Sequence, residues 1–168
     1  KLKELKTSHL YITSSNDDGL TWSKPINITN QVKENYMSFI GAGPGVGITV
    51  KKGKYKGRLI FPLYYNVIEK FQILMLSACV MYSYDNGKTW HRGKSPNQTR
   101  KHGIFTVGHR FVLQGDMITE TQLIECEGGR LKLFMRNHSS KKLIATAISD
   151  DGGETWQDYK HHPQLPHC

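Results

Sequence analysis

The stretch SYDNGKTW, residues 83–90, stands three times in nearly the same form in this chain of 168 residues. The other two copies are SNDDGLTW at 15–22 and SDDGGETW at 149–156, and all three read S-x-D-x-G-x-T-W. The copies follow one another at nearly equal intervals of about 66 to 68 residues, which marks a structural repeat. Each interval can hold about four strands with their loops, and this predicts the four-stranded blades of a β-propeller.

Within each copy, the residue types predict a tight turn between two antiparallel strands. The aspartate carboxylate can accept backbone N–H bonds across the turn, and the glycine allows the tight bend. The tryptophan that closes each copy gives its hairpin a large apolar anchor. We therefore assign Trp22, Trp90 and Trp156 to the packing of blades.

The rest of the chain consists of short β-type runs between turn signals, without a long segment of helical periodicity. The expected strands are HLYITS (9–14), VGITVK (46–51), RLIFPLYY (58–65), LMLSACVMYSY (74–84), TQLIEC (121–126), RLKLFMR (130–136) and KLIATAIS (142–149). Between two of them, Glu127-Gly128-Gly129 predicts a hairpin turn, because glycine tolerates positive φ. The sequence therefore predicts an all-β protein.

Composition places the chain among globular proteins, with 38% hydrophobic and 22% charged residues. No run approaches the roughly 18 to 20 apolar residues that span a bilayer, and the first ten residues lack the apolar centre of a signal peptide. The net charge of +9 is spread over the chain. It leaves open a nucleic-acid binder, a solubilising surface or a surface that attracts anionic ligands.

Cysteine and histidine residues give only weak signals for a metal site or a disulfide framework. The three cysteines, Cys79, Cys126 and Cys168, are too few and too widely spaced for either. Because Cys79 and Cys126 lie in apolar runs, we expect both in the core. The tail KHHPQLPHC (160–168) is expected to be solvated, since adjacent histidines in a proline-rich tail seldom form a metal site.

The three repeats resemble the Asp boxes of the sialidase-type β-propeller. This resemblance implies a six-bladed fold in which the boxes are structural and lie away from the catalytic face. Six blades need roughly 400 residues, so we expect 1–168 to be the middle part of such a catalytic domain, with about two to three blades present. Asp boxes also occur in propellers that are not sialidases, so they predict no activity by themselves.

The segment ETQLIECEGGRLKLFMRNHS (120–139) resembles a bacterial sialidase segment in which a glutamate opens one strand and an arginine closes the next. Glu120 and Arg136 fit that spacing, and a hairpin can bring two such ends to one rim. The resemblance implies that Arg136 is one of three arginines that bind the carboxylate of sialic acid. It implies that Glu120 accepts the proton of a nucleophilic tyrosine. The alternative is an exposed salt bridge, worth about 0 to 1 kcal/mol.

A second segment, YMSFIGAGPGVGITV (36–50), resembles the G-x-G-P-G-x-G-I segment of the large secreted sialidases of Gram-positive bacteria. It does not fit a dinucleotide fingerprint, because Pro44 interrupts the loop and a strand follows where a helix is needed. The resemblance places the segment near the sugar pocket. Tyr65, in the next strand, is then the candidate for an aromatic residue that faces substrate, with a core or rim tyrosine as the alternative. Gln72 is the candidate for a pocket glutamine.

The resemblance implies that the intact protein is a secreted or surface-attached bacterial exo-α-sialidase. It would release terminal α-linked sialic acids from glycoconjugates through a covalent tyrosyl intermediate. Water would then give hydrolysis, whereas the sugar's own hydroxyl would give the anhydro product of an intramolecular trans-sialidase. No metal or organic cofactor is implied. The expected partners are sialylated glycoconjugates and the remaining blades, on this chain or a complementary one, with no nucleic acid and no membrane span in this segment.

Several catalytic parts of the family are absent from these 168 residues. We find no Arg-Ile-Pro segment, which carries the first arginine, and no matching aspartate as general acid. The third arginine and the tyrosine are expected downstream, so we expect this chain alone to be inactive. The alternative from another class is a non-catalytic Asp-box propeller that binds carbohydrate or protein. The segment with Glu120 and Arg136 distinguishes the two, because a scaffold has no need of it.

Overall fold

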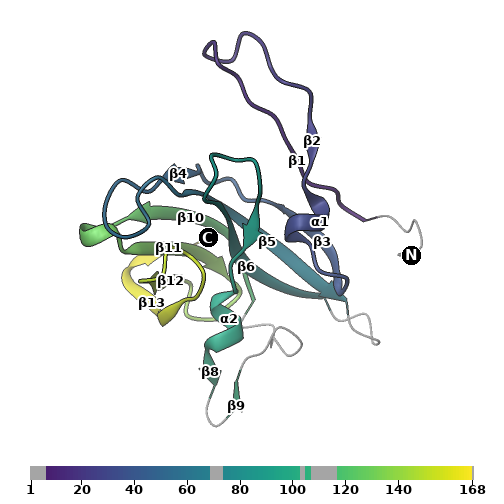
Figure 1. The fold of residues 1–168 in the computed structure, drawn as a ribbon. Coiled ribbons are helices and arrows are strands. Elements are labelled where there is room, and N and C mark those ends of the chain that lie inside the picture. The colour runs from purple at the N-terminus through teal and green to yellow at the C-terminus, as the bar shows by residue number, and fades with distance from the viewer. Residues whose placement is uncertain (1–6, 69–73, 103–104, 107–116, 168) are drawn as a thin grey trace.

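The computed structural model describes residues 7–68, 74–102, 105–106 and 117–167, and nearly all of its regular structure is β (Figure 1). Two antiparallel sheets form most of it. One sheet has the order β10-β11-β12-β13, and the other has the order β3-β5-β6-β7, with β4 also paired to β5. Their bounds are β3 (Met37–Ala42), β4 (Ile48–Thr49), β5 (Leu59–Ile68), β6 (Leu74–Ser83), β7 (His91–Arg92), β10 (Ile118–Glu125), β11 (Leu131–Asn137), β12 (Leu143–Ser149) and β13 (Gln157–Pro166).

The remaining elements are short. Two small sheets pair β1 with β2 and β8 with β9, and one 3-10 turn connects β10 to β11. Their bounds are β1 (Tyr11–Ile12), β2 (Ile26–Asn27), α1 (Thr29–Val32), α2 (Pro96–Thr99), β8 (Lys101–His102), β9 (Phe105–Thr106) and the 3-10 turn Glu127–Gly129. In that turn Gly128 and Gly129 have φ of 71° and 83°, as the predicted hairpin requires. No helix among the described residues is long and apolar enough to cross a membrane.

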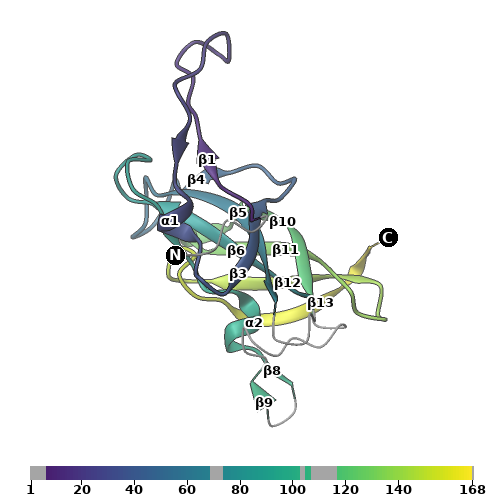
Figure 2. The same ribbon diagram turned by 90° about the vertical axis from the view of Figure 1, so that its right-hand side faces the viewer.

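The two large sheets are built in the same way, as the repeat predicts. In each, successive strands pair as antiparallel neighbours, and the Asp box connects the last two, β6 to β7 and β12 to β13. The first residue of β5 and that of β11 pair with the serine that opens the Asp box of their own sheet. The first box connects β1 and β2 in a hairpin that projects from the rest in both views (Figure 1, Figure 2). The described residues thus form two blades and a projecting hairpin.

The same hydrogen bonds hold all three boxes. In each, the serine hydroxyl donates to the aspartate at 2.7–2.8 Å, and the threonine amide donates to the same carboxylate at 2.9 Å. The glycine amide donates to the serine oxygen at 2.8–2.9 Å. Hydrogen bonds from Ser15 and Thr21 lower the pKa of Asp17 to about 2, and bonds from Thr89 and Ser83 lower that of Asp85 as well. The carboxylates are therefore components of the turn.

A large hydrophobic cluster lies between the two blades. Strands β5 and β6 contribute Ile60, Ala78 and Val80, and all three side chains are fully buried. On the other side, β10 and β11 contribute Leu123, Leu131, Leu133 and Met135, all equally buried. In β10 and β11 these residues alternate with more exposed ones, whereas in β6 the alternate residues Cys79 and Met81 are buried in a second cluster on the other face. Each blade thus turns an apolar face towards its neighbour.

Several sequence-based expectations need correction. The expected strands omit β3 and β13, because a run of only six residues carries little period-2 signal and the tail lacks a strand pattern. The tail is mostly exposed, as expected, but its residues 160–166 belong to the outer strand of a blade. Cys79 is fully buried as expected, but Cys126 is only half-buried, because it lies after the end of β10. Trp90 and Trp156 are 2% and 3% exposed, whereas Trp22 is 62% exposed.

Candidate functional site

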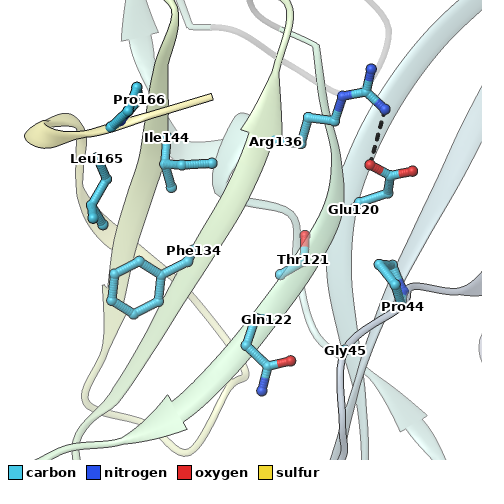
Figure 3. Close-up of a pocket in the computed structure, with 10 residues that line it drawn as sticks. All are labelled: Pro44, Gly45, Glu120, Thr121, Gln122, Phe134, Arg136, Ile144, Leu165 and Pro166. Carbon is cyan, nitrogen blue, oxygen red and sulfur yellow. Dashed lines mark hydrogen bonds and ion pairs between the residues drawn. The ribbon is translucent and has the colours of Figure 1, made fainter. Parts of the chain in front are cut away.

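Glu120 and Arg136 lie side by side at one end of the β10–β13 blade. They come together because β10 and β11 are antiparallel, with Ile118 near the start of one strand paired to Asn137 at the end of the other. Arg136 Nη1 donates to Glu120 Oε2 at 3.0 Å (Figure 3). Their side chains are 51% and 44% exposed, so both can be reached by a ligand.

The backbone around this pair is held in place by local hydrogen bonds. The register of β10 against β11 shifts between Ile118 and Thr121, which is a β-bulge at the position of Glu120. Such bulges re-aim a side chain at the edge of a site. Next to Arg136, Asn137 Nδ2 donates to the carbonyl of Leu143 at 2.7 Å, which ties the end of β11 to β12. The pair is thus presented by a fixed strand end.

The glycine-rich segment lies against the same strand. The amide of Val46 donates to Gln122 Oε1 at 3.1 Å, which ties the loop to β10. A Cβ on Gly45 would come within 2.4 Å of the carbonyl oxygen of Thr121, so only glycine fits there. The sequence segment that was expected near the sugar pocket therefore touches the strand that carries Glu120.

These elements enclose one side of an open pocket of about 370 Å³. Figure 3 shows Glu120 and Arg136 turned towards each other on one side, with Phe134 and Ile144 on the other. The lining residues are Pro44, Gly45, Glu120, Thr121, Gln122, Phe134, Arg136, Ile144, Leu165 and Pro166. The pocket therefore combines one carboxylate, one guanidinium and an apolar wall.

The Asp box of this blade lies at the opposite end of the strands. Glu125, the last residue of β10, pairs with Leu131, and Leu131 pairs with Ser149, which opens the box. Arg136 and Glu120 lie near the other ends of the same two strands. This geometry agrees with the structural role that the sequence assigned to the boxes.

Tyr65, another predicted site residue, does not line this pocket. Tyr65 lies in β5 opposite Ser77 and is fully buried, and this burial raises the pKa of its phenol. Its position fits the core alternative rather than a side chain that faces substrate. Gln72 lies outside the described residues. Among those residues, no group of three or more His, Cys, Asp and Glu could hold a metal ion.

Two residues that line the pocket were not predicted, Gln122 and Phe134. They lie two positions from Glu120 and Arg136 on the same strands, and they pair with each other. Side chains two positions apart in a strand lie on the same face. The positions of Glu120 and Arg136 therefore predict that Gln122 and Phe134 share their face of the sheet. Without the register of β10 against β11, their meeting could not be derived.

Fold and site together define a segment of an Asp-box β-propeller. It carries the ion pair of Glu120 and Arg136 on the rim that lies away from its boxes. A family model described as BNR repeat-like domain matches residues 1–167, and the chain belongs to this family. Among curated relatives, a sialidase of Bacteroides fragilis is 37% identical over 92% of this chain and 23% of its own length. An anhydrosialidase of Macrobdella decora is 31% identical over 93% of this chain and 17% of its own.

Solved structures give the same result. The Hadza microbial sialidase Hz136 superposes with a TM-score of 0.68 and 32% identity over 98% of this chain and 26% of its own. The leech intramolecular trans-sialidase with 2,7-anhydro-Neu5Ac superposes with a TM-score of 0.71 and 29% identity, over 95% of this chain and 20% of its own. These comparisons confirm the predicted resemblance to sialidases and the partial propeller. The chain spans about a quarter or less of the length of these proteins.

Proposed function

We propose that the intact protein containing these residues is an exo-α-sialidase that releases terminal α-linked sialic acids from glycoconjugates. The observation that carries the proposal is the pair of Glu120 and Arg136, 3.0 Å apart on the rim that faces away from the Asp boxes. Its support is that relatives named as sialidases cover nearly the whole of this chain. A non-catalytic scaffold has no need of the sialidase-like segment that carries this pair.

In this proposal Arg136 binds the carboxylate of the sugar. One of its nitrogens, Nη1, is bonded to Glu120, which fixes the plane of the guanidinium. The other N–H groups can donate to a carboxylate, and a planar guanidinium does so with two parallel bonds. Arginine also remains charged at every working pH, which lysine in a crowded site does not.

Glu120 acts as the base for a tyrosine nucleophile from outside this chain. As the phenol oxygen attacks the anomeric carbon, the phenol proton passes to Glu120 and the glycosidic bond breaks to release the leaving group. A neutral phenol approaches an anomeric centre that bears a carboxylate more easily than an anionic nucleophile does. Glycosidases with a tyrosine nucleophile are known exceptions to the two-carboxylate mechanism.

Two acceptors can end the covalent intermediate. Attack by water gives free sialic acid, whereas attack by the sugar's own hydroxyl gives an anhydro product. An anhydrosialidase and an intramolecular trans-sialidase are among the similar proteins. The residues that decide between these outcomes lie outside this chain. We further propose that the intact protein is secreted or attached to the cell surface, where sialylated glycoconjugates occur.

The experiment is product analysis after incubation of the intact protein with a sialyl-lactose. Free sialic acid or its anhydro form in the product supports a sialidase, and the ratio of the two identifies the acceptor. Tight binding of sialyl-lactose without cleavage supports the alternative, a non-catalytic carbohydrate-binding propeller. Residues 1–168 alone, which lack the proposed tyrosine nucleophile, should not hydrolyse a fluorogenic sialoside. Turnover by them would refute the proposal that the nucleophile lies outside these residues.

A further inference from the structure

A basic turn lies beside the candidate site, where β11 is connected to β12. Residues 138–142, with the sequence HSSKK, form this turn and follow Arg136 and Asn137 directly. Lys141 and Lys142 are exposed, and neither forms an ion pair within the part of the chain that the structure describes. The cleavage chemistry proposed above leaves these two cations without a role.

Hydrogen bonds hold the backbone of this turn. The Ser139 amide donates to Asn137 Oδ1 at 3.0 Å, and the Lys141 amide donates to Ser139 Oγ at 3.3 Å. The Lys142 amide donates to the Ser139 carbonyl at 3.2 Å, and the Lys142 carbonyl accepts from the amide of His167 at 3.0 Å. Asn137, which anchors the turn, is 2% exposed. The backbone that carries the two lysines is therefore held from both sides.

The turn brings these cations close to Arg136 but leaves them outside the pocket. Asn137 Nδ2 donates to the carbonyl of Leu143 at 2.7 Å, so β11 and β12 remain adjacent at their ends. The path from Arg136 to Lys142 is two steps along the chain and one strand spacing, which places their Cα atoms within roughly 13 Å of each other. Neither lysine lines the pocket. A sugar held by Arg136 would occupy the pocket, and the lysines would meet groups that extend beyond it.

The charges around the site favour a negatively charged extension. Glu120 is the one acidic residue among the described residues that line the pocket, and its carboxylate is already bonded to Arg136. An enzyme that removes terminal sugars holds the end of a glycan, so the rest of the glycan, its acceptor part, leaves across the rim. Lysine suits an anion there, because its flexible point charge requires no fixed geometry.

We propose that Lys141 and Lys142 give the site a preference for sialosides whose acceptor part carries a second anion, either a sulfate or the carboxylate of a further sialic acid. This inference rests on the proposed function, because Arg136 must first hold the terminal sugar. Complementary charges chiefly raise the association rate and the specificity. The preference therefore appears in kcat/KM and declines as salt screens the rim.

The test compares kcat/KM of the intact protein for 3′-sialyl-lactose and for the same sugar with a sulfate on its galactose. The sulfated substrate should be preferred by about fivefold or more at low salt. The preference should approach one at about 1 M salt, where the screening length is about 3 Å. The double variant Lys141→Gln with Lys142→Gln should show the high-salt ratio even at low salt, and an unchanged ratio would overturn the proposal. A disialyl-lactose shows whether a second carboxylate serves as well as a sulfate.

A matched control separates the turn from the net charge of the whole protein. Lys51 and Lys52 are also adjacent, exposed and without an ion pair among the described residues. Their amides bind the carboxylate of Glu125, the last residue of β10, so they lie at the box end. Lys51→Gln with Lys52→Gln removes the same charge and should leave the preference for the sulfated substrate unchanged. Equal losses of preference in the two double variants would overturn the proposal.

Binding measurements distinguish a failure of this inference from a failure of the proposed function. If no sialoside is cleaved, the sialidase proposal fails, and titration of the same two sugars into the protein compares their dissociation constants instead. The sulfated sugar should then bind about fivefold more tightly, and the Lys141 and Lys142 variant should lose this difference. Equal kcat/KM for both sugars would refute the preference and leave the sialidase function standing. A protein that neither cleaves nor binds them contradicts both proposals.

Discussion

The β10–β13 blade carries an ion pair at each end, and the two pairs are almost alike. Arg130 and Asp150 meet at 2.7 Å with side chains 54% and 48% exposed, and Arg136 and Glu120 meet at 3.0 Å with 51% and 44%. Geometry and exposure therefore do not distinguish a candidate site from a surface salt bridge. The difference lies in the surroundings. Both pairs line a pocket, but the pocket of Arg130 and Asp150 adjoins an Asp box whose hydrogen bonds are satisfied. The pocket of Glu120 and Arg136 adjoins the glycine-rich loop and an apolar wall of Phe134 and Ile144.

This comparison teaches that function must be argued from what surrounds a charged pair. At the box end, the carboxylate of Asp151 is already bonded to Ser149 and Thr155. At the site end, Arg136 retains donors, and the glycine-rich loop lines the same pocket as Glu120. The two ends should therefore respond to mutation in different ways, one through stability and the other through activity.

The largest expected effect belongs to the box end. In residues 1–168, Trp156→Ala should lower the free energy of unfolding by about 3 to 5 kcal/mol, because this side chain is 3% exposed in the cluster between the blades. Trp22→Ala in the same chain should lower it by less than about 1 kcal/mol, since Trp22 is 62% exposed. Denaturant unfolding measures both. Equal losses of unfolding free energy in the two variants would show that Trp22 and its hairpin are packed in solution.

In the intact protein, Trp156→Ala should leave the turnover per folded molecule unchanged, because the box lies at the far end of its blade. An unchanged melting temperature together with abolished turnover would place the box in the active site instead.

One glycine in each region can be replaced to test its role. Gly45 allows a close approach at the site, and Gly87 allows the turn of a box. Gly45→Ala puts a Cβ 2.4 Å from the carbonyl of Thr121, so the loop must move and the Michaelis constant should rise by about tenfold. Gly87→Ala, at φ 85° in a box where the added Cβ makes only ordinary contacts with Trp90 and Leu59, should cost about 1 kcal/mol of stability and leave kinetics unchanged. Steady-state kinetics and thermal unfolding of the two variants decide this. A kinetic effect of Gly87→Ala alone would reverse the assignment.

The sequence predicts the local features of this fold better than the long-range ones. The boxes, the Gly-Gly turn and the spacing of Glu120 and Arg136 depend on short segments, and the structure contains all three. The burial of Tyr65 depends on which blades surround β5, and the exposure of Trp22 depends on which strands lie beside its hairpin. Neither could be derived from the sequence, because the residues around an apolar side chain do not show whether another element covers it.

A smaller effect concerns pH. The pKa of Asp17 is lowered to about 2 by hydrogen bonds from Ser15 and Thr21, and bonds from Thr89 and Ser83 lower that of Asp85. A lowered folded-state pKa means that these carboxylates stabilise the turns above the unfolded value near 4. Stability should therefore fall as the pH drops from about 4 towards 2. Thermal unfolding at a series of pH values should show this fall, and it should be smaller in Asp85→Asn. An equal fall in that variant would contradict the assignment.

The most direct test of the account measures kcat and ligand binding in separate variants of Glu120 and Arg136 in the intact protein. Glu120→Gln should lower kcat by about 10² to 10⁴ and leave binding of a sialic acid analogue nearly intact, because it removes a proton acceptor. Arg136→Lys should mainly weaken binding of the analogue, because it keeps the charge but loses the bidentate fork. The control Glu34→Gln, which removes the charge of an exposed glutamate that pairs with the largely buried Arg92, should change neither. Wild-type kinetics for both site variants would contradict the account and leave the pair as a surface salt bridge.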